Sequence, residues 1–440
     1  MRKLLASALM LMSVCTTATA QAPISLADGV LDMTDKSALG LTKAPGTETI
    51  TVFQPTETTD HYSNGVVLAA FKGTLYCMWQ SDPQNEDYPE TWVAMSKSTD
   101  NGATWSAPEV LDSLTAEQNA KEMYVSSGGW LVTEDSLIAY LNVQASESNL
   151  KKYGTRRYIA YRATADGEHW TESRPVLMED GEPLYGIFEQ DPRILPNGRI
   201  IGAAHFPTAS NIAAKMLMPI YTDNATGTRG WKKADFKYTD KKSNSREMEP
   251  SWYMRGDSIV MVMRDQNSTY RKLVSVSLDN GETWSKAVET NIPDSRAKQS
   301  AGNLSDGTAF LASNPTDSKN RWPMALLLSD DGETFNKGWL LRSKDELPER
   351  KWTGKAKTLG FSYPKSIVYN NALWVAYSQN KEEVLITKVP LSSVSTGLTK
   401  VVNGESHFMK DQSAYNLAGQ RVDDSYKGIV ILNGKKFIRR

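Results

Sequence analysis

The chain has 440 residues, with 50 lysines and arginines against 51 aspartates and glutamates, two cysteines and four histidines. The near-zero net charge excludes a nucleic-acid-binding protein that relies on bulk positive charge. Two cysteines cannot build a disulfide scaffold or a four-thiolate zinc site, and the widely separated histidines show no ligand spacing. We therefore expect no metal, no cofactor and no nucleic-acid partner.

The first twenty residues have the composition of an export signal. Arg2 and Lys3 precede an apolar run over 4–14, and a small-x-small pattern of the kind that signal peptidase cleaves ends at Ala20. The apolar run is far shorter than the roughly 20 residues that a membrane-spanning helix needs. We expect an exported protein with no membrane span, located in the periplasm, on the cell surface or outside the cell.

Pairs of short strands joined by polar turns follow one another along the rest of the chain. Each pair combines apolar runs with a turn rich in Gly, Asn or Asp, and no long helical periodicity competes with them. An additional extended segment precedes them at 48–53. The pairs lie near residues 65–79, 125–143, 193–205, 251–264, 301–313 and 366–378.

A turn motif recurs between these pairs. Two full copies, at 98–105 and 277–284, share the pattern Ser-x-Asp-Asn-Gly-x-Thr-Trp, and weaker copies end at Trp170, Trp231 and Phe335. Asn and Gly tolerate positive φ and the Asp side chain can accept hydrogen bonds from turn amides, so the motif predicts a tight hairpin. Its spacing of roughly 50 to 65 residues indicates one repeated β unit.

Six such units predict an all-β chain folded as a six-bladed β-propeller, with the segment at 48–53 closing the ring. The expected organisation is a signal peptide at 1–20, an N-terminal extension with the closing strand at 21–57, the propeller at 58–395 and a short C-terminal β tail at 396–440.

These turn motifs resemble the Asp-box (BNR) repeats of the sialidase superfamily, and the resemblance covers residues 60–393. It implies a six-bladed propeller with an active site at the axial mouth. Asp boxes also occur in propellers that lack sialidase activity, so the residues of the mouth must decide the function.

Several positions match the catalytic pattern of that superfamily. Tyr363, at the start of the last blade, matches the nucleophilic tyrosine, Glu249 matches its glutamate partner, and Asp87 matches the acid/base aspartate. Arg264 and Arg321 match two arginines of the triad that binds the substrate carboxylate. Each of these residues also has a purely structural reading, as an ion-pair partner, a core aromatic or a solvated carboxylate.

The first blade departs from the pattern. Ser63 stands where sialidases have the third arginine of the triad, and loss of one bidentate contact weakens a carboxylate clamp. His61, two residues earlier, resembles the histidine that sialidase-fold rhamnosidases and uronate lyases place in the first blade. Histidine is a natural acid or base near neutral pH, so His61 is a further catalytic candidate.

Three other cations precede inner strands and are expected to line the mouth, where they would favour an anionic sugar. They are Arg193, Arg296 and Lys298. Balance by neighbouring acids is the alternative reading.

The leading hypothesis is an exported, exo-acting glycoside hydrolase of the sialidase superfamily that cleaves a terminal acidic sugar, either sialic acid-like or uronate-linked. One alternative is a lyase or rhamnosidase acting on uronate-containing polysaccharide through a central His61. The other is a non-catalytic carbohydrate-binding propeller. The tail beyond residue 395 resembles a β module appended to many secreted bacterial proteins, which suggests a bacterial source.

Overall fold

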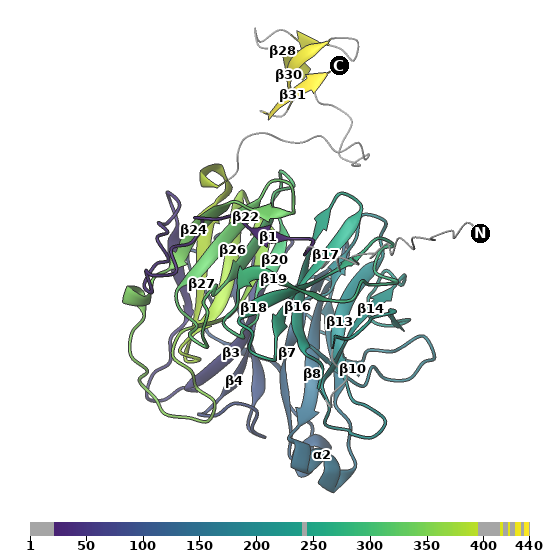
Figure 1. The fold of residues 1–440 in the computed structure, drawn as a ribbon. Helices are drawn as coiled ribbons and strands as arrows, with labels where there is room; N and C mark the ends of the chain where they lie inside the picture. The colour runs from purple at the N-terminus through teal and green to yellow at the C-terminus, as the bar shows by residue number, and fades with distance from the viewer. Residues whose placement is uncertain are drawn as a thin grey trace, which may run out of the picture.

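The computed structural model describes residues 22–239, 244–394, 414–416, 421–422, 427–432 and 435–439. The export signal expected at 1–20 lies outside these residues. Six antiparallel sheets, five of them supplied by consecutive stretches of the chain, form the blades of a propeller (Figure 1). The prediction of a six-bladed, all-β propeller is therefore confirmed.

Each blade runs from an inner strand near the axis to an outer strand. Blade 1 contains β3 (Tyr62–Phe71), β4 (Thr74–Asp82), β5 (Trp92–Ser98) and β6 (Glu109–Asp112). Blade 2 contains β7 (Met123–Val132), β8 (Leu137–Ala145), β9 (Tyr158–Thr164) and β10 (Arg174–Pro175). Blade 3 has a divided inner strand, and contains β11 (Ile187–Phe188), β12 (Arg193–Ile194), β13 (Ile200–Phe206), β14 (Met216–Thr222) and β15 (Lys232–Lys233).

The remaining blades repeat this order. Blade 4 contains β16 (Glu247–Arg255), β17 (Ser258–Asp265), β18 (Arg271–Ser277) and β19 (Val288–Pro293). Blade 5 contains β20 (Ser300–Asn303), β21 (Ala309–Ser313), β22 (Met324–Ser329) and β24 (Lys337–Arg342). Blade 6 contains β25 (Phe361–Tyr369), β26 (Ala372–Gln379), β27 (Glu383–Pro390) and, as its outer strand, β2 (Glu48–Phe53).

The sixth blade closes the ring, because β2 comes from the N-terminal side of blade 1 and pairs antiparallel with β27. These inter-strand hydrogen bonds join the two ends of the propeller within one sheet, as expected for the segment at 48–53.

Small elements complete the described chain. Two short helices, α1 (Ala116–Ala120) and α2 (Glu147–Tyr153), lie in blade 2 connections, and 3-10 turns occur at Lys344–Glu346 and Leu391–Ser393. β1 (Ser25–Leu26) pairs with β23 (Thr334–Phe335). The tail contains one sheet in the order β29-β28-β30-β31, formed by Arg421–Val422, Ala414–Asn416, Gly428–Leu432 and Lys435–Arg439. Among the described residues, no helix is long and apolar enough to cross a membrane.

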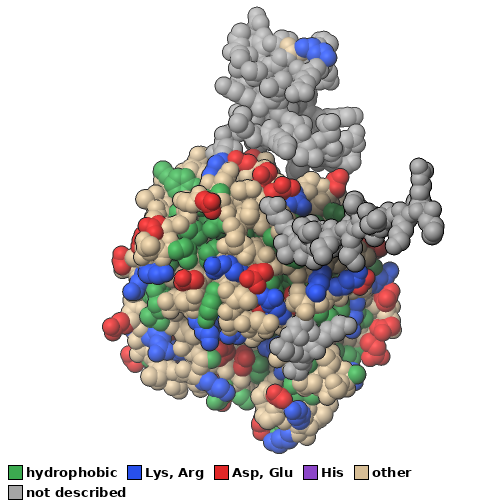
Figure 2. All heavy atoms as spheres, viewed as in Figure 1, with side chains coloured by type: hydrophobic (Ala, Val, Ile, Leu, Met, Phe, Trp, Pro, Cys, Tyr) green, Lys and Arg blue, Asp and Glu red, His purple; other side chains and the backbone are tan. Residues whose placement is uncertain are grey.

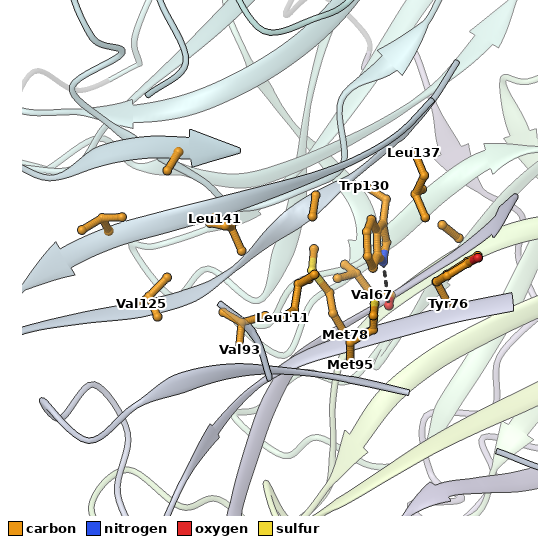
Figure 3. Close-up of a cluster of buried hydrophobic side chains, with 14 of the residues drawn as sticks. Val67, Tyr76, Met78, Val93, Met95, Leu111, Val125, Trp130, Leu137 and Leu141 are labelled. Carbon is orange, nitrogen blue, oxygen red and sulfur yellow. Dashed lines mark hydrogen bonds between the residues drawn. The ribbon is translucent and has the colours of Figure 1, made fainter. Parts of the chain in front are cut away.

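Apolar side chains of neighbouring blades pack face to face. In Figure 3, Val67 and Met78 of blade 1 meet Trp130 and Leu141 of blade 2, and the Trp130 indole donates a hydrogen bond to the Val67 carbonyl at 3.2 Å. Each fully buried side chain of this kind contributes about 1.5–3 kcal/mol to folding. Cys77 is likewise buried, and burial raises the pKa of its thiol, so it is an inert core residue.

The Asp-box turns join the third and fourth strands of blades 1 to 5, and we call this side of the propeller the box end. In the box between β18 and β19, Asp279 accepts hydrogen bonds from the Thr283 amide at 2.9 Å, the Thr283 hydroxyl at 2.6 Å and the Ser277 hydroxyl at 2.8 Å. Gly281 has φ of 87° in this turn. These hydrogen bonds are local, which supports a structural role for the boxes.

The opposite side, where the inner strands begin, we call the mouth end. Antiparallel order places the connections between second and third strands at the same end, so residues from all six blades converge there. On the side view in Figure 2, acidic and basic side chains are interspersed, in keeping with the balanced composition.

Candidate functional site

Bulges interrupt the inner strands of four blades at the mouth end. The register of the inner strand shifts between Asn64 and Val67 in β3, between Ser127 and Gly129 in β7, between Met248 and Ser251 in β16, and between Ser362 and Lys365 in β25. A bulge redirects side chains relative to the strand. In these four inner strands, side chains near the start of the strand therefore point in directions that a regular strand would not allow.

Each bulge contains a residue with positive φ. In β3 and β7 it is a glycine, Gly65 with φ of 62° and Gly129 with φ of 148°. In β16 and β25 it is Glu249 with φ of 50° and Tyr363 with φ of 60°. Such a conformation costs a non-glycine residue roughly 1–3 kcal/mol and is concentrated at functional sites. Two residues that the sequence marks as catalytic thus occupy strained positions.

Tyr363 lies among positive charges. Its hydroxyl accepts a hydrogen bond from an Arg321 guanidinium nitrogen at 2.8 Å, and the Nζ atoms of Lys298 and Lys381 lie 5.2 and 5.5 Å from its ring centroid. Burial alone would raise the pKa of the phenol, but the charges of Arg321 and Lys381 outweigh burial and lower the pKa below its usual range. The site therefore makes the phenolate, which is the nucleophilic form, easier to form than in an ordinary tyrosine.

The Arg321 guanidinium is held from the side of blade 6. It also donates hydrogen bonds to the hydroxyls of Thr358 at 3.1 Å and Ser362 at 3.0 Å, and the Arg321 backbone carbonyl accepts from the Phe361 amide at 2.9 Å. These contacts fix the guanidinium beside Tyr363.

Glu249 and Arg264 form a neighbouring ion pair, with 2.9 Å between Glu249 Oε2 and an Arg264 guanidinium nitrogen. Burial would raise the pKa of Glu249, which is 7% exposed, but the charges of Arg264 and Lys298 together outweigh burial and lower the pKa. Within the described chain, no hydrogen bond joins Glu249 to the Tyr363 hydroxyl. Glu249 is thus an ionised partner of Arg264.

Glu189 and His205 extend the cluster into blade 3. Glu189 lies 2.5 Å from Lys298 Nζ and 3.5 Å from the Nδ1 atom of the fully buried His205. Burial would raise the pKa of Glu189, but Lys298 and His205 lower it well below its usual range. Lys298 therefore lies between a buried carboxylate and the Tyr363 ring.

Asp87 stands in the connection between β4 and β5, with φ of 62° and an exposed side chain. Gln80 donates a hydrogen bond to its carboxylate at 3.2 Å. The pKa of Asp87 is raised, first by removal from water and then by the negative charge of neighbouring Glu86. A side chain that is both accessible and partly desolvated fits a concave site, and a raised pKa suits a proton donor.

Ser63, which stands where the sialidase pattern has a third arginine, lies next to Lys381. Ser63 is buried, and its backbone amide donates a hydrogen bond to the Lys381 carbonyl at 2.9 Å. The Lys381 ammonium contacts both oxygens of Glu86, at 2.7 and 2.8 Å. Blade 6 thus brings a cation to the region where blade 1 lacks one.

Three of the candidate residues have no described contact with this cluster. His61 stacks on Trp352, its Nε2 atom lies 3.0 Å from the Thr56 carbonyl, and no described contact joins it to Tyr363. Arg193 donates to the Trp252 carbonyl at 2.7 Å and lines a cavity of about 390 Å³ toward the box end of the inner strands, instead of the expected mouth. Arg296, with φ of 52°, lies in the mouth-end connection before β20, and its Nε atom is buried without a partner among the described residues.

The structure therefore brings together Tyr363, Arg321, Lys298, Glu249 and Arg264 at the mouth end, and places Asp87 in a blade 1 connection at the same end. Sequence reasoning did not assign roles to Glu86, His205 or Lys381, and it considered Glu189 only as an acid that balances neighbouring cations, which its contact with Lys298 bears out. Glu86 could have been found because it is next to Asp87 in the sequence. His205 and Lys381 contact the site from other blades, and no local sequence motif indicates such contacts. In the part of the chain that is described, no cluster of three or more potential metal ligands occurs.

Comparison with known proteins gives one family match and several structural ones. A model described as a BNR repeat-like domain matches residues 73–375. No curated protein matches the sequence. A structure described as a sialidase has a TM-score of 0.58 at 20% identity, covering 84% of this chain and 35% of its own, so the chain spans about a third of that protein.

Two further structures are similar across the propeller. A Dyadobacter fermentans protein of unknown function has a TM-score of 0.58 at 15% identity, covering 79% of this chain and 99% of its own. The NanB sialidase of Streptococcus pneumoniae has a TM-score of 0.57 at 14% identity, covering 78% and 71%. At these identities the likeness shows the fold. Because the family model spans more than half of the sequence, the chain belongs to the BNR repeat-like family and is a β-propeller of the sialidase superfamily.

Proposed function

We propose that the protein is an exported, exo-acting glycoside hydrolase that cleaves a terminal acidic sugar from a glycan. The observation that carries the proposal is the environment of Tyr363, whose hydroxyl lies 2.8 Å from Arg321 and whose ring is flanked by Lys298 and Lys381. Positive charge at this point stabilises the phenolate and attracts an anionic sugar.

The proposed reaction begins when the Tyr363 phenol loses its proton to solvent, aided by the charges of Arg321 and Lys381, and the resulting phenolate oxygen attacks the anomeric carbon. A C–O bond to Tyr363 forms as the glycosidic C–O bond breaks, and Asp87 donates its proton to the leaving oxygen. Water then attacks the same carbon, gives a proton to Asp87 and releases Tyr363. A phenol is suited to this role because a permanently anionic nucleophile would be repelled by a carboxylate on the sugar.

Arg264 and Arg321 are assigned to the sugar carboxylate in this scheme. Glu249 orients Arg264 instead of accepting the phenol proton, since its carboxylate is paired with that guanidinium. Lys381 supplies charge beside Ser63, but a lysine lacks the bidentate fork of arginine and this one is shared with Glu86. We therefore include both sialic acid-like and uronate substrates in the proposal.

A non-catalytic glycan-binding propeller is the second candidate. It is favoured by one observation, the pairing of Glu249 with Arg264, which leaves the Tyr363 hydroxyl without a carboxylate base among the described residues. The contacts of His61 with Trp352 and Thr56 do not favour a lyase or rhamnosidase that uses it as the central base.

The test compares the parent protein with Tyr363→Phe on aryl α-sialosides and aryl β-glucuronides, by release of the aryl alcohol. We expect the parent to hydrolyse one of these classes and Tyr363→Phe to lose about 10³-fold or more in kcat/KM. Tyr369→Phe, on the same strand at the box end, is the matched control and keeps parental activity.

Two results would contradict the proposal. Glycan binding by the parent without turnover supports the binding propeller. An ultraviolet-absorbing unsaturated uronate released from a uronate polysaccharide identifies a lyase, because hydrolysis cannot form that product.

A further inference from the structure

The connection between β24 and β25 carries an aromatic stack at the mouth end. Trp352, in this connection, lies over the ring of His61 with 4.5 Å between ring centroids and 12° between ring planes. The His61 ring is fixed in turn, because its Nε2 atom donates to the Thr56 carbonyl at 3.0 Å. Trp352 remains half-exposed. The indole is thus supported on one face and accessible to solvent.

The backbone around Trp352 is anchored to blade 6. The amides of Lys351 and Trp352 donate to the Glu382 carboxylate at 3.1 and 3.0 Å. Lys357 reaches both the same carboxylate, at 3.1 Å, and the His61 carbonyl, at 2.6 Å. These contacts fix the position of the indole before any ligand arrives, which lowers the entropic cost of binding.

The same connection is tied to the segment that carries Asp87. The Lys355 amide donates to the Asn85 side chain at 2.9 Å, and the Lys355 carbonyl accepts from the Glu86 amide at 3.3 Å. A Cβ added to Gly354 would lie 2.2 Å from the Gln84 carbonyl oxygen, so the two segments pack closely. Trp352 therefore adjoins the side of the mouth on which the proposed proton donor stands.

Two lysines of the connection are exposed. Lys351 and Lys355 form no ion pair in the described part of the chain, whereas Glu86 is occupied by Lys381. The Lys355 ammonium lies 5.1 Å from the ring centroid of Tyr88, which is 36% exposed. A simple packing role for Trp352 would explain the stack on His61, but it does not explain why unpaired cations flank a half-exposed indole on an anchored loop.

We propose that Trp352, supported by His61 and flanked by Lys351 and Lys355, is a second saccharide subsite that receives an acidic sugar ring on the leaving-group side. The flat C–H face of a sugar ring packs on the indole, and its carboxylate or sulfate group meets the two ammonium groups. The assignment to the leaving-group side rests on the proposed function, because it follows from the place of Asp87. His61 is in this view a positioning residue and not a base.

The test measures binding of three hexasaccharides to full-length protein carrying Tyr363→Phe, by calorimetry, so that turnover does not interfere. The probes are oligosialic acid, which carries carboxylates, chondroitin sulfate, which adds sulfates, and neutral maltohexaose. We expect at least one anionic probe to bind more than 10-fold tighter than maltohexaose, with an affinity that falls as salt rises.

Added substitutions separate the subsite from a general effect on folding. We expect Trp352→Ala to weaken binding at least 10-fold, Trp352→Phe to restore part of it, and Lys351→Ala/Lys355→Ala to reduce both affinity and salt dependence. His61→Ala weakens binding less than Trp352→Ala. Trp105→Ala and Lys286→Ala, at the box end, are controls that keep parental affinity, and thermal unfolding checks each fold.

The inference is overturned if no anionic probe binds, or if Trp352→Ala and the lysine pair bind like the parent. Its failure is distinct from that of the proposed function. If the parent hydrolyses aryl glycosides and Trp352→Ala leaves binding unaltered, the hydrolase proposal stands and the subsite proposal fails. If binding depends on Trp352 and no substrate is turned over, the subsite proposal stands and the hydrolase proposal fails.

Discussion

Blades 1 and 2 can be compared with blades 4 and 6 at one structural feature, the inner-strand bulge of the mouth end. In β3 and β7 the positive-φ position is Gly65 or Gly129, and in β16 and β25 it is Glu249 or Tyr363. Glycine adopts this conformation at no steric cost. The bulge is thus common to these blades, and backbone strain within it is retained only at the two positions that carry proposed functional side chains.

Removal of the Glu249 charge should have the largest effect on stability. We expect Glu249→Gln to lower the free energy of unfolding by about 3 kcal/mol at neutral pH, because it leaves Arg264 without its partner in a recess. The charges of Arg264 and Lys298 outweigh burial and lower the Glu249 pKa, so the stabilisation is present above about pH 4.3 and is lost as pH falls through the lowered pKa. Urea unfolding at pH 7 and in acid measures the difference in free energy of unfolding between the parent and Glu249→Gln. The prediction is wrong if this difference does not become smaller in acid.

A side chain at a glycine bulge should be the next most disruptive. We expect Gly65→Ala to cost about 2 kcal/mol, because alanine resists φ of 62° and its Cβ would lie 2.7 Å from the Ser127 hydroxyl. Gly73→Ala is the matched control, since Gly73 has φ of 83° and no atom within 4 Å of an added Cβ. Chemical denaturation measures the free energy of unfolding of both variants. If Gly65→Ala and Gly73→Ala lower it equally, the bulge position is not crowded.

The box end offers a contrast in which stability changes and function does not. We expect Asp279→Ala to lower the free energy of unfolding by about 1 kcal/mol, because the turn loses the hydrogen bonds from Thr283 and Ser277. The value of kcat/KM for the proposed hydrolysis should stay unchanged. A large loss of activity in a folded variant would mean that the two ends are coupled.

A smaller effect of opposite sign is expected at Asp87. Desolvation and Glu86 raise the Asp87 pKa, so its charge destabilises the fold once pH exceeds the ordinary range of aspartate. Asp87→Asn should therefore unfold at a higher temperature than the parent at pH 7, and the difference should disappear below about pH 3.9, where both states are protonated. Greater stability of the parent at pH 7 would show that the carboxylate is stabilised by its neighbours.

The fold was largely predictable because its signals are local. Asp-Asn-Gly turns and alternating strand pairs lie within short stretches of sequence, and they predicted six blades and the closing strand at 48–53. The proximity of Tyr363 to Arg321 and of Glu249 to Arg264 was predictable because a motif surrounds each residue, whereas their roles remain proposals.

The rest of the site depends on contacts between blades. Lys381 meets Glu86 across 295 positions of sequence, and Arg321 meets Tyr363 across 42. His205 contacts Glu189 of the cluster, whereas His61 is held by Trp352. Neither pairing has a sequence pattern, because each depends on how two blades are placed around the axis.

We propose that Tyr363 is the residue that attacks the sugar. The most direct measurement is peptide mass mapping after incubation with a fluorinated glycosyl fluoride of the acidic sugar that the protein hydrolyses, since fluorine slows release of the intermediate. We expect the mass of the glycosyl group to be added to the peptide containing Tyr363 and to be absent in Tyr363→Phe. An adduct on Asp87 or Glu249, or parental turnover by Tyr363→Phe, would contradict it.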